Sequence, residues 1–559
     1  MISTATRPVL IAGAGPVGLS LAMDLAWRGV PSVILDPNRT INPHPRAISI
    51  GVRTMEHYRR MGIAEDVIDA GVPRDRALDV VYVTRILDRE IYRFEIPSIQ
   101  DLATRGPELA RGTPELAASP YYKTWTAQTP LEAVLRRQLA ARPQVGMRLG
   151  WRLESFREDP GSVEAIIVED GTGERQRITG SYLVGCDGAA SVVRKQLGIR
   201  LEGQGTLGAA RGVYFRAPEL DRRLGRRPGV MYWVLAPDSA GVVYTIDGGG
   251  EWVLNRYYQQ ENELPADPRV MVQRALGETI EVEILSDQNW LPRQLVAERY
   301  GSRRVFLAGD ACHLFVPTGG FGMNTGIGDA VDLGWKIAAV LEGWGGPDLL
   351  STYEAERRPI GIHNTLEAAD NYFRSGELFA DIGDIEEDGP RGEATRARVA
   401  AKLPTKLKHF APIGVHLGYR YTASPLIIPD GTPEPPHEAA AYTPTARPGH
   451  RAPHLWLRPG QSTLDLFGRG FTLLNLGEDE SVSREFLAAA AARGMPLAVA
   501  AIADGEVRRL YQRRLVLVRP DGHVAWRGDT LSGAAGPLLD RVRGAALSEV
   551  DARSPLEAL

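Results

Sequence analysis

The stretch GAGPVG at residues 13–18 constrains the fold more than any other part of this chain. It follows the apolar run Val9–Ala12 and precedes the largely apolar stretch Leu19–Trp27. This order predicts a strand, a glycine turn and a helix, followed by a second strand over Ser32–Asp36. Together these elements form a βαβ unit with a right-handed crossover. Glycines in G-x-G-x-x-G order at a strand–helix junction are typical of a dinucleotide-binding fold.

Each residue of this motif has a distinct physical role. Gly13 permits the tight turn, Gly15 lets a pyrophosphate approach the backbone, and Gly18 lets the helix pack closely on the strand. The free N–H groups at the helix N-terminus then bind the phosphates. Asp36 ends the second strand, 18 residues after Gly18, where a carboxylate accepts bonds from a ribose 2′-hydroxyl and repels a 2′-phosphate. At this point both FAD and NAD are possible ligands.

Length and composition narrow the class of protein. The chain has 559 residues, and single cores stop growing near ~250–300 residues, so two or three domains are expected. The net charge of −4 gives no electrostatic reason to expect a nucleic acid or an anionic membrane as partner. No apolar run approaches the ~20 residues of a membrane span, and no signal peptide is evident. The two cysteines, Cys186 and Cys312, suit a reducing cytoplasm and form no metal-site pattern.

Between the motifs, the pattern predicts a helix over residues 128–141, with Thr129 as its N-cap, and a polar loop over residues 102–118. Residues 151–181 suggest a small antiparallel sheet with a turn at Gly171. From about residue 208 to 290, successive strands predict an antiparallel sheet with one large apolar face, which suits an organic substrate.

Further along, a long helix is expected over Asn324–Glu342 and another over Leu349–Ala369. Residues 376–450 are rich in proline and glycine, which marks a domain boundary. A third unit follows from Arg451, with a helix for which Ser483 is the expected N-cap.

Three further motifs identify a family. They are HPRAISIGVRTMEHYRRMG, YLVGCDGAASVVRKQLGI and RVFLAGDACHLFVPTGGFGMNTGIGDAVDLGWKI. With GAGPVG and the later YEAERRP, they resemble the FAD-dependent aromatic hydroxylases of the para-hydroxybenzoate hydroxylase type, which are group A flavoprotein monooxygenases. The stretches STLDLFGRGF and RPDGHVAWRGD extend the resemblance to larger members with a C-terminal extension. Among these, the flavoproteins of the rebeccamycin and staurosporine pathways are the most similar.

The resemblance implies an α/β fold with three parts. A Rossmann-like, glutathione-reductase-like FAD-binding domain is expected from residues 1–75, 120–200 and 295–375. An antiparallel substrate-binding sheet domain is expected from residues 76–119 and 201–294. After a helical, proline-rich linker over 376–450, a thioredoxin-like domain is expected over 451–559. Because both cysteines lie elsewhere, this last domain has no CxxC and thioredoxin-type redox chemistry is excluded.

Carried over to this chain, the resemblance assigns residues to the cofactor. Gly13, Gly15, Pro16 and Gly18 would hold the FAD pyrophosphate, and Asp36 the adenosine ribose. Toward the flavin, the implied residues are Arg46, Gln128, Asp187, Asp310, Gly322, Met323 and Asn324. Arg46 and Pro317 are the expected catalytic positions at the junction of flavin and substrate, and no metal is expected.

The implied reaction is a monooxygenation. FAD stays bound, NADPH or NADH binds transiently, and O₂ forms a flavin C4a-hydroperoxide that hydroxylates an aromatic or polycyclic, phenolic substrate. Baeyer–Villiger or decarboxylating oxygenation on the same site is an alternative, as is a flavoprotein that sequesters a reactive intermediate. The chain is expected to act as a monomer or homodimer. No W-x-W-x-I-P stretch supports a flavin halogenase.

Several tempting residues also have ordinary structural explanations. His313 beside Asp310 is expected to be a hydrogen-bonding core histidine rather than a general base, and Cys312 a buried filler. Tyr232, Trp233 and Tyr244 lie on predicted strands of the middle sheet, where aromatic side chains form core more often than substrate pockets. They are nevertheless the candidate substrate residues.

Overall fold

Five parallel strands form the sheet that the glycine motif predicts. The computed structural model describes residues 7–225, 227–258, 267–380 and 382–546, so the extreme ends of the first and last predicted domains lie outside the described residues. The strand order is β17-β9-β1-β2-β5. The strands are β1 (Val9–Ala12), β2 (Ser32–Asp36), β5 (Val145–Leu149), β9 (Tyr182–Gly185) and β17 (Val305–Leu307).

Helices cover this sheet and contribute to one large core. Helix α1 (Pro16–Arg28) joins β1 to β2 and packs against α9 (Phe321–Leu341) and α5 (Gln128–Ala140). Two shorter helices, α2 (Val52–Met61) and α3 (Ala64–Asp69), follow β2. The predicted βαβ unit is therefore confirmed, and α1 ends as expected at Gly29, whose φ of +86° lies in the left-handed region.

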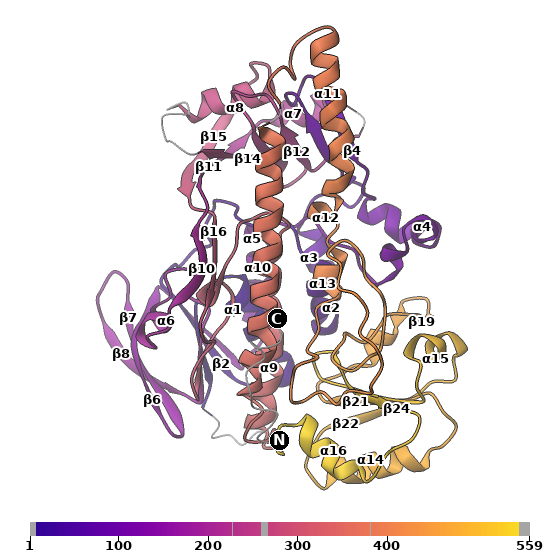
Figure 1. The fold of residues 1–559 in the computed structure, drawn as a ribbon. Helices are drawn as coiled ribbons and strands as arrows, with labels where there is room; N and C mark the ends of the chain where they lie inside the picture. Colours follow the sequence, from indigo (N-terminus) through magenta and orange to yellow (C-terminus); the bar gives the residue numbers. More distant parts are fainter. Residues whose placement is uncertain (1–6, 226, 259–266, 381, 547–559) are drawn as a thin grey trace.

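Two smaller sheets flank this unit. The antiparallel sheet predicted for residues 151–181 is confirmed, and Gly171 in its second turn has a φ of +121°. It consists of β6 (Trp151–Asp159), β7 (Ser162–Glu169) and β8 (Arg175–Gly180). The other sheet leads toward the upper part of the molecule in Figure 1 and consists of β10 (Leu201–Thr206), β16 (Arg293–Ala297) and β18 (His313–Leu314).

A seven-stranded sheet forms the upper unit in Figure 1, with the order β15-β11-β14-β13-β12-β3-β4. All its pairs are antiparallel except β3 with β12, which is parallel. Its outer face packs on α7 (Pro218–Arg223) and α8 (Pro268–Leu276). The strands are β3 (Val80–Val83), β4 (Glu90–Phe94), β11 (Ala209–Arg216), β12 (Met231–Val234), β13 (Gly241–Thr245), β14 (Glu251–Tyr258) and β15 (Glu283–Trp290).

The expected loop over residues 102–118 is wrong, because most of it is helix α4 (Ile99–Gly112). Ser98 caps this helix: its hydroxyl accepts from the Asp101 N–H at 3.0 Å, and the Asp101 carboxylate accepts from the Ser98 N–H at 3.1 Å. This reciprocal pair is a capping box, which stabilises a helix start even where the composition is polar.

Two expected N-caps are also wrong. Helix α5 is preceded by Ala127, and the hydroxyl of Thr129 donates to the Asn42 carbonyl at 3.3 Å instead of capping. In the C-terminal unit, α14 is preceded by Glu480, while the Ser483 hydroxyl accepts from the Asn475 amide at 2.9 Å. In both places a hydroxyl near the helix start bonds to a neighbouring segment rather than to the first helical turn.

Helix α10 (Thr352–Phe379) runs from the lower unit to the seven-stranded sheet, so the predicted boundary at residue 375 falls inside it (Figure 1). The following segment is more than a linker. It contains the helices α11 (Pro390–Lys402), α12 (Leu407–Phe410) and α13 (Ile413–Leu417). Val399 of α11 and Phe410 of α12 join the core of the sheet's inner face.

The C-terminal unit has the sheet order β22-β21-β23-β24, with β21 and β22 parallel and the other pairs antiparallel. This order and the intervening helices give the expected thioredoxin-like fold. The elements are β19 (Trp456–Arg458), β20 (Gln461–Ser462), β21 (Phe471–Asn475), α14 (Ser481–Ala491), β22 (Leu497–Ala501), α15 (Gly505–Tyr511), β23 (Leu515–Val518), β24 (Val524–Gly528) and α16 (Ala535–Val542). Among the described helices, none is both long and apolar enough to cross a membrane.

Candidate functional site

The three motif glycines differ in what surrounds them. A Cβ added to Gly13 would lie 2.2 Å from the Cys186 carbonyl oxygen, and one on Gly18 would lie 2.1 Å from the Gly13 oxygen. Around Gly15 no atom comes within 4 Å of the same position. Gly13 and Gly18 are therefore needed for close packing, whereas Gly15 and the adjoining start of α1 at Pro16 border open space. That space fits a pyrophosphate on the helix N-terminus.

Asp36 closes the same loop from the end of β2. One carboxylate oxygen accepts from the Ala14 N–H at 2.7 Å, and the other accepts from the Asn38 N–H at 2.8 Å. Each carboxylate oxygen has further lone pairs. The carboxylate therefore ties the glycine loop to β2 and keeps acceptor capacity for a ribose hydroxyl.

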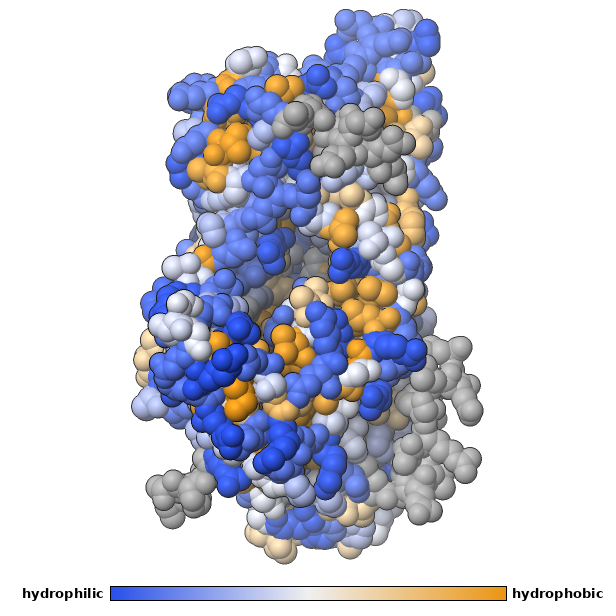
Figure 2. All heavy atoms as spheres, turned by 90° about the vertical axis from the view of Figure 1, so that its left-hand side faces the viewer, coloured by the Kyte–Doolittle hydropathy of each residue, from blue (hydrophilic) through white to orange (hydrophobic). Residues whose placement is uncertain are grey.

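Asp310 lies in the short turn Gly309–Ala311 that follows β17. Its residue is exposed to solvent, although protein surrounds it closely enough for burial to raise the pKa of its carboxyl, an effect that His313 and Arg46 oppose. A carboxylate that is accessible to solvent yet surrounded by protein is typical of a residue that lines a ligand cavity. It is less typical of a core residue or of a residue on a convex surface. Figure 2 shows a hollow between the upper and lower units, with apolar side chains along its edge.

Arg46 and Gln128 lie on two segments that are hydrogen-bonded to each other. The Gln128 N–H donates to the Ala47 carbonyl at 2.7 Å, which holds the start of α5 against the segment that carries Arg46. The Gln128 side chain donates to Glu132 at 2.7 Å. Arg46 and Pro317 are both exposed, as residues that face a ligand cavity would be.

Helix α9 begins at Phe321, three residues before the predicted start, after Gly319 and Gly320 with φ of +91° and +69°. Gly322, Met323 and Asn324 thus form its first turn, and all three are partly accessible. Asn324 links this turn to helix α2, because its Oδ1 accepts from the Gly51 N–H and the Thr54 hydroxyl, both at 2.7 Å. The first turns of α9 and α2 are therefore joined, and both helices present their positive ends here.

Asp187 caps helix α6 (Val192–Gln196). Its carboxylate accepts from the Ser191 hydroxyl at 2.6 Å and from the N–H groups of Val192 and Val193 at 2.7 and 3.1 Å. Arg194 of that helix donates to the Ala311 carbonyl at 3.1 Å. The turn that carries Asp187 is thereby linked to the turn that carries Asp310.

His313 is buried, with Nε2 at 2.7 Å from Asp329, which also accepts from Arg357 at 2.8 Å. Cys312 lies beside them, and ligand-type atoms of Cys312, His313 and Asp329 lie within 4.8 Å of one another. Burial raises the pKa of the Cys312 thiol well above its usual value. Asp329 is already shared between two partners, so this group is best described as a hydrogen-bonded core cluster.

The sequence-predicted substrate aromatics do not share one face of the sheet. Tyr232 and Trp233 are consecutive in β12 and therefore point to opposite faces. Tyr232 packs in the outer core with α8, away from the inner face. Trp233 is buried in the inner core between Tyr82 and Phe379. Tyr244 lies on the same inner face, where its hydroxyl accepts from Asn255 at 3.0 Å.

Residues that the sequence did not single out converge at Gly212, a buried residue on the inner face of the sheet. A Cβ on Gly212 would lie 2.9 Å from Asn255 Oδ1, 3.3 Å from His44 Nε2 and 3.6 Å from Trp290 Nε1. His44 Nδ1 also lies 2.6 Å from the Ser286 hydroxyl. The only sequence signal was the position of His44, two residues before Arg46. The segment that carries His44 and Arg46 therefore contacts the seven-stranded sheet through His44 and lies near Asp310 through Arg46.

Comparison with known proteins agrees with this arrangement. Residues 6–368 match the family described as FAD binding domain, and residues 445–546 match aromatic-ring hydroxylase, C-terminal. The structure of RebC soaked with chromopyrrolic acid and holding 7-carboxy-K252c superimposes with a TM-score of 0.88 at 40% identity, covering 97% of this chain and 99% of that one. RebC, a rebeccamycin biosynthetic enzyme, has also been solved with reduced flavin.

Two curated relatives are similar over nearly their whole length. The FAD-dependent monooxygenase apdD of Emericella nidulans is 34% identical over 94% of this chain and 88% of its own length. The tetracenomycin B2 monooxygenase-dioxygenase of Streptomyces olivaceus is 33% identical over 96% of this chain and 97% of its own. The chain thus belongs to the FAD-dependent aromatic-ring monooxygenases, and it is an enzyme of that class.

Proposed function

We propose that this enzyme uses NADPH or NADH and O₂ to hydroxylate an aromatic or polycyclic, phenolic substrate. The observation that carries the proposal is the hollow between the two units (Figure 2). The accessible residues Asp310 and Arg46 and the joined starts of α2 and α9 belong to the lower unit. The group of His44, Asn255 and Trp290 lies at Gly212 on the inner face of the upper sheet. Cofactor and substrate would meet in this hollow.

The residues present fit FAD in an extended pose. The open space at Gly15 would take the pyrophosphate, and Asp36 the adenosine ribose. Asp310 would accept bonds from the ribityl hydroxyls, with Arg46 and Gln128 beside the flavin and Pro317 at the mouth. When bound, FAD supplies the redox and oxygen chemistry, while the protein supplies position and electrostatics.

The chain's own residues would contribute charge and orientation. The helix N-termini at Gly51 and Phe321 favour negative charge near them, as on a reduced flavin. On the substrate side, His44, Asn255 and Tyr244 offer hydrogen-bonding groups, and Trp290 an aromatic surface. A planar molecule with a phenolic hydroxyl matches such a surface. Asp187 would support the site indirectly, by holding α6 and the Asp310 turn.

Anaerobic stopped-flow reduction tests the proposal. The FAD-loaded enzyme is mixed with NADPH or NADH, with and without a panel of polycyclic phenols, and flavin absorbance is followed. We expect reduction by one of the two nicotinamides, accelerated by at least one phenol. Admission of O₂ with that phenol then gives a product containing one added oxygen atom. If neither nicotinamide reduces the flavin with any phenol present, the proposal fails.

Two variants of the reaction use the same site. Product structure distinguishes ring hydroxylation from Baeyer–Villiger insertion or decarboxylating oxygenation. The likeness to RebC at 40% identity favours a second candidate, a flavoprotein that sequesters and steers a reactive intermediate. An Asp310→Ala variant that has lost FAD yet leaves the product distribution unchanged would support this second candidate.

A further inference from the structure

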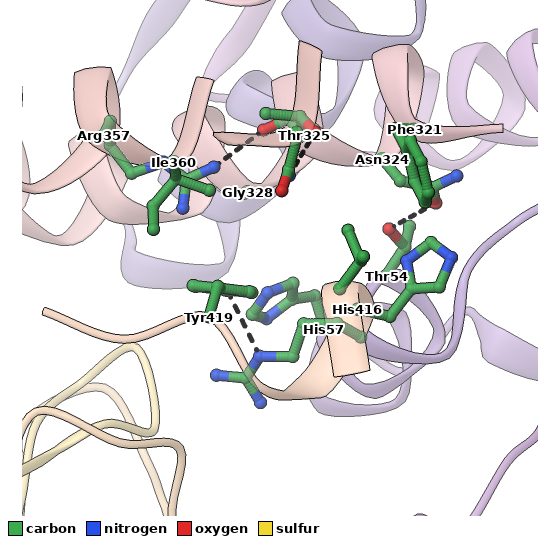
Figure 3. Close-up of a pocket in the computed structure, with 13 residues that line it drawn as sticks. Thr54, His57, Phe321, Asn324, Thr325, Gly328, Arg357, Ile360, His416 and Tyr419 are labelled. Carbon is green, nitrogen blue, oxygen red and sulfur yellow. Dashed lines mark hydrogen bonds between the residues drawn. The ribbon is translucent and has the colours of Figure 1, made fainter. Parts of the chain in front are cut away.

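Helix α2 is bonded at its N-terminus to the flavin-facing turn of α9. The Asn324 side chain accepts from Gly51 and Thr54 of the α2 start, and its own amide donates to the Gly320 carbonyl at 2.7 Å. Figure 3 shows Thr54 and Asn324 facing each other across the two helices. A displacement of α2 would therefore move the first turn of α9.

One turn further along, α2 is bonded to the C-terminal domain. Glu56 is buried and accepts from Arg451 through both Nε, at 2.9 Å, and Nη2. The same carboxylate accepts from Arg53 and from the Ser119 hydroxyl, each at 2.7 Å. Arg53 in turn donates to the Asp521 carbonyl at 2.6 Å. Arg451 and Asp521 both belong to the C-terminal aromatic-ring hydroxylase domain.

The C-terminal domain also holds α9 and α10. Arg519, which is fully buried, donates to Glu356 of α10 at 2.6 Å and to Asp332 of α9 at 3.1 Å. Lys336 of α9 donates to Glu356 and Asp332 at 2.7 and 2.8 Å. The C-terminal domain thus contacts both α2 and α9, the two helices whose first turns are joined by Asn324.

A small pocket lies between parts of α2, α9 and α10 (Figure 3). Its walls include Arg53 and His57 from α2, Asn324 from α9, and Arg357 from α10. Arg357 is already bonded to Asp329, Tyr421 and the Thr325 carbonyl, so the pocket offers no free guanidinium to an anion there. The bonds at Asn324 and Glu56 therefore hold α2 on either side of this pocket.

The electrostatics of Glu56 fit such a role. Burial raises its pKa, but Arg451 and Arg53 outweigh burial and lower the pKa to about 2. Removing one member of a buried charge group leaves the others uncompensated, so its geometry is tightly enforced.

We infer that Glu56 and Arg451 are positioning residues, through which the C-terminal domain sets the isoalloxazine side of the FAD site. This inference rests on the FAD site proposed above. It gives the domain a role that needs no CxxC. The adenosine side also contacts the C-terminal domain, but at the far end of α1, where Arg28 donates to the Arg469 and Pro520 carbonyls at 2.9 and 3.5 Å. The glycine loop and Asp36, which would hold the adenosine part, are bonded to each other instead.

The test compares FAD with ADP, because ADP occupies only the adenosine side. In Glu56→Gln we expect the Kd for FAD to rise at least about tenfold, while the Kd for ADP stays within about twofold. The flavin absorbance spectrum of the loaded variant should shift as well. FAD binding is followed by flavin fluorescence, and ADP binding by calorimetry.

Asp430→Asn is the matched control. It breaks a buried bond of 2.6 Å to Arg527 in the C-terminal part of the chain, and neither residue is bonded to α2 or α9. This control should lower the Tm and leave both Kd values unchanged. Equal losses of FAD and ADP affinity in Glu56→Gln, or a lower Tm with unchanged FAD affinity, would overturn the inference.

A milder variant covers the case in which Glu56→Gln does not fold. Arg451→Lys keeps the charge but loses the bidentate contact with Glu56. It should change the ratio of FAD to ADP affinity in the same direction as Glu56→Gln, by a smaller factor. An unchanged ratio in Arg451→Lys would also count against the inference. If the parent enzyme itself binds no FAD, the proposed function fails instead.

Discussion

The two ends of the candidate FAD site are built in different ways. The adenosine end lies within one βαβ unit, where Gly13 to Asp36 supply both the loop and the carboxylate that closes it. The isoalloxazine end combines Arg46, Asp310 and Asn324 from separate parts of the chain, and buried ion pairs link it to the C-terminal domain. A locally built site depends on backbone geometry, whereas an assembled one also depends on distant contacts.

The sharpest way to break the adenosine end is within its own loop. In Gly18→Ala the new Cβ would lie 2.1 Å from the Gly13 oxygen, so the loop and α1 must move apart. Overpacking of this kind costs roughly 3 kcal/mol or more, and we expect loss of both stability and FAD binding. Thermal denaturation of the apo-protein and FAD titration measure the two effects.

Gly15→Ala separates binding from folding in the same loop. Gly15 has a φ of −76° and no atom within 4 Å of an added Cβ, so the apo-protein should keep its Tm. The methyl group would occupy the space assigned to the pyrophosphate, and the Kd for FAD should rise by about 100-fold, or ~2.7 kcal/mol. Parent-like FAD affinity in Gly15→Ala would place the pyrophosphate elsewhere.

The same contrast explains what the sequence could predict. The βαβ unit and the strands of the middle sheet follow from local patterns of apolar residues and glycines. The thioredoxin-like arrangement of the C-terminal unit was implied by the family resemblance. Helix α4 was missed because its polar composition outweighed the capping signal at Ser98 and Asp101. The start of α9 was misplaced because left-handed glycines lie directly before Phe321, where glycine density suggests a loop.

The substrate side could be predicted least. Tyr232 and Trp233 were grouped together although strand alternation sends neighbours to opposite faces, an error that the pattern itself could have prevented. The convergence of His44, Asn255 and Trp290 above Gly212 could not have been predicted in this way. These residues lie on segments far apart in the chain, and only the tertiary fold brings them together.

Mild acid should loosen the assembled end before the local one. Burial lowers the pKa of four buried histidines in the later half of the chain: His409 and His450 to about 3, and His454 and His523 to about 4. Residues 9–36 contain no histidine. Because the folded pKa lies below the ordinary 6.5, stabilisation from the neutral rings is present above pH 6.5 and is lost as the pH falls toward 4.

By pH 5, protonation of each such ring in the unfolded chain has removed up to ~2 kcal/mol of stability. Between pH 7 and 5, the protection factors against hydrogen exchange should therefore fall more in the C-terminal domain and α2 than in β1 and α1. His523→Gln removes one titrating group and should lower the slope of stability against pH by up to ~1.4 kcal/mol per pH unit. A slope that is unchanged from that of the parent would show that folding does not lower the pKa of His523.

The smallest effect on stability is expected at Asp310, where the two ends of the cofactor site meet. Burial raises the pKa of this carboxyl above that of the unfolded chain, so the ionised form is disfavoured by folding, and its cost is present at neutral pH and disappears as the pH falls through the folded pKa. Asp310→Asn should thus leave the Tm of the apo-protein equal to or slightly above that of the parent at pH 7, and the difference should vanish in acid.

The same variant loses an acceptor for the ribityl hydroxyls and should weaken FAD binding about tenfold. Thermal denaturation at two pH values and FAD titration test both parts; a variant that is clearly less stable than the parent at pH 7 would mean that Asp310 supports the fold rather than the ligand.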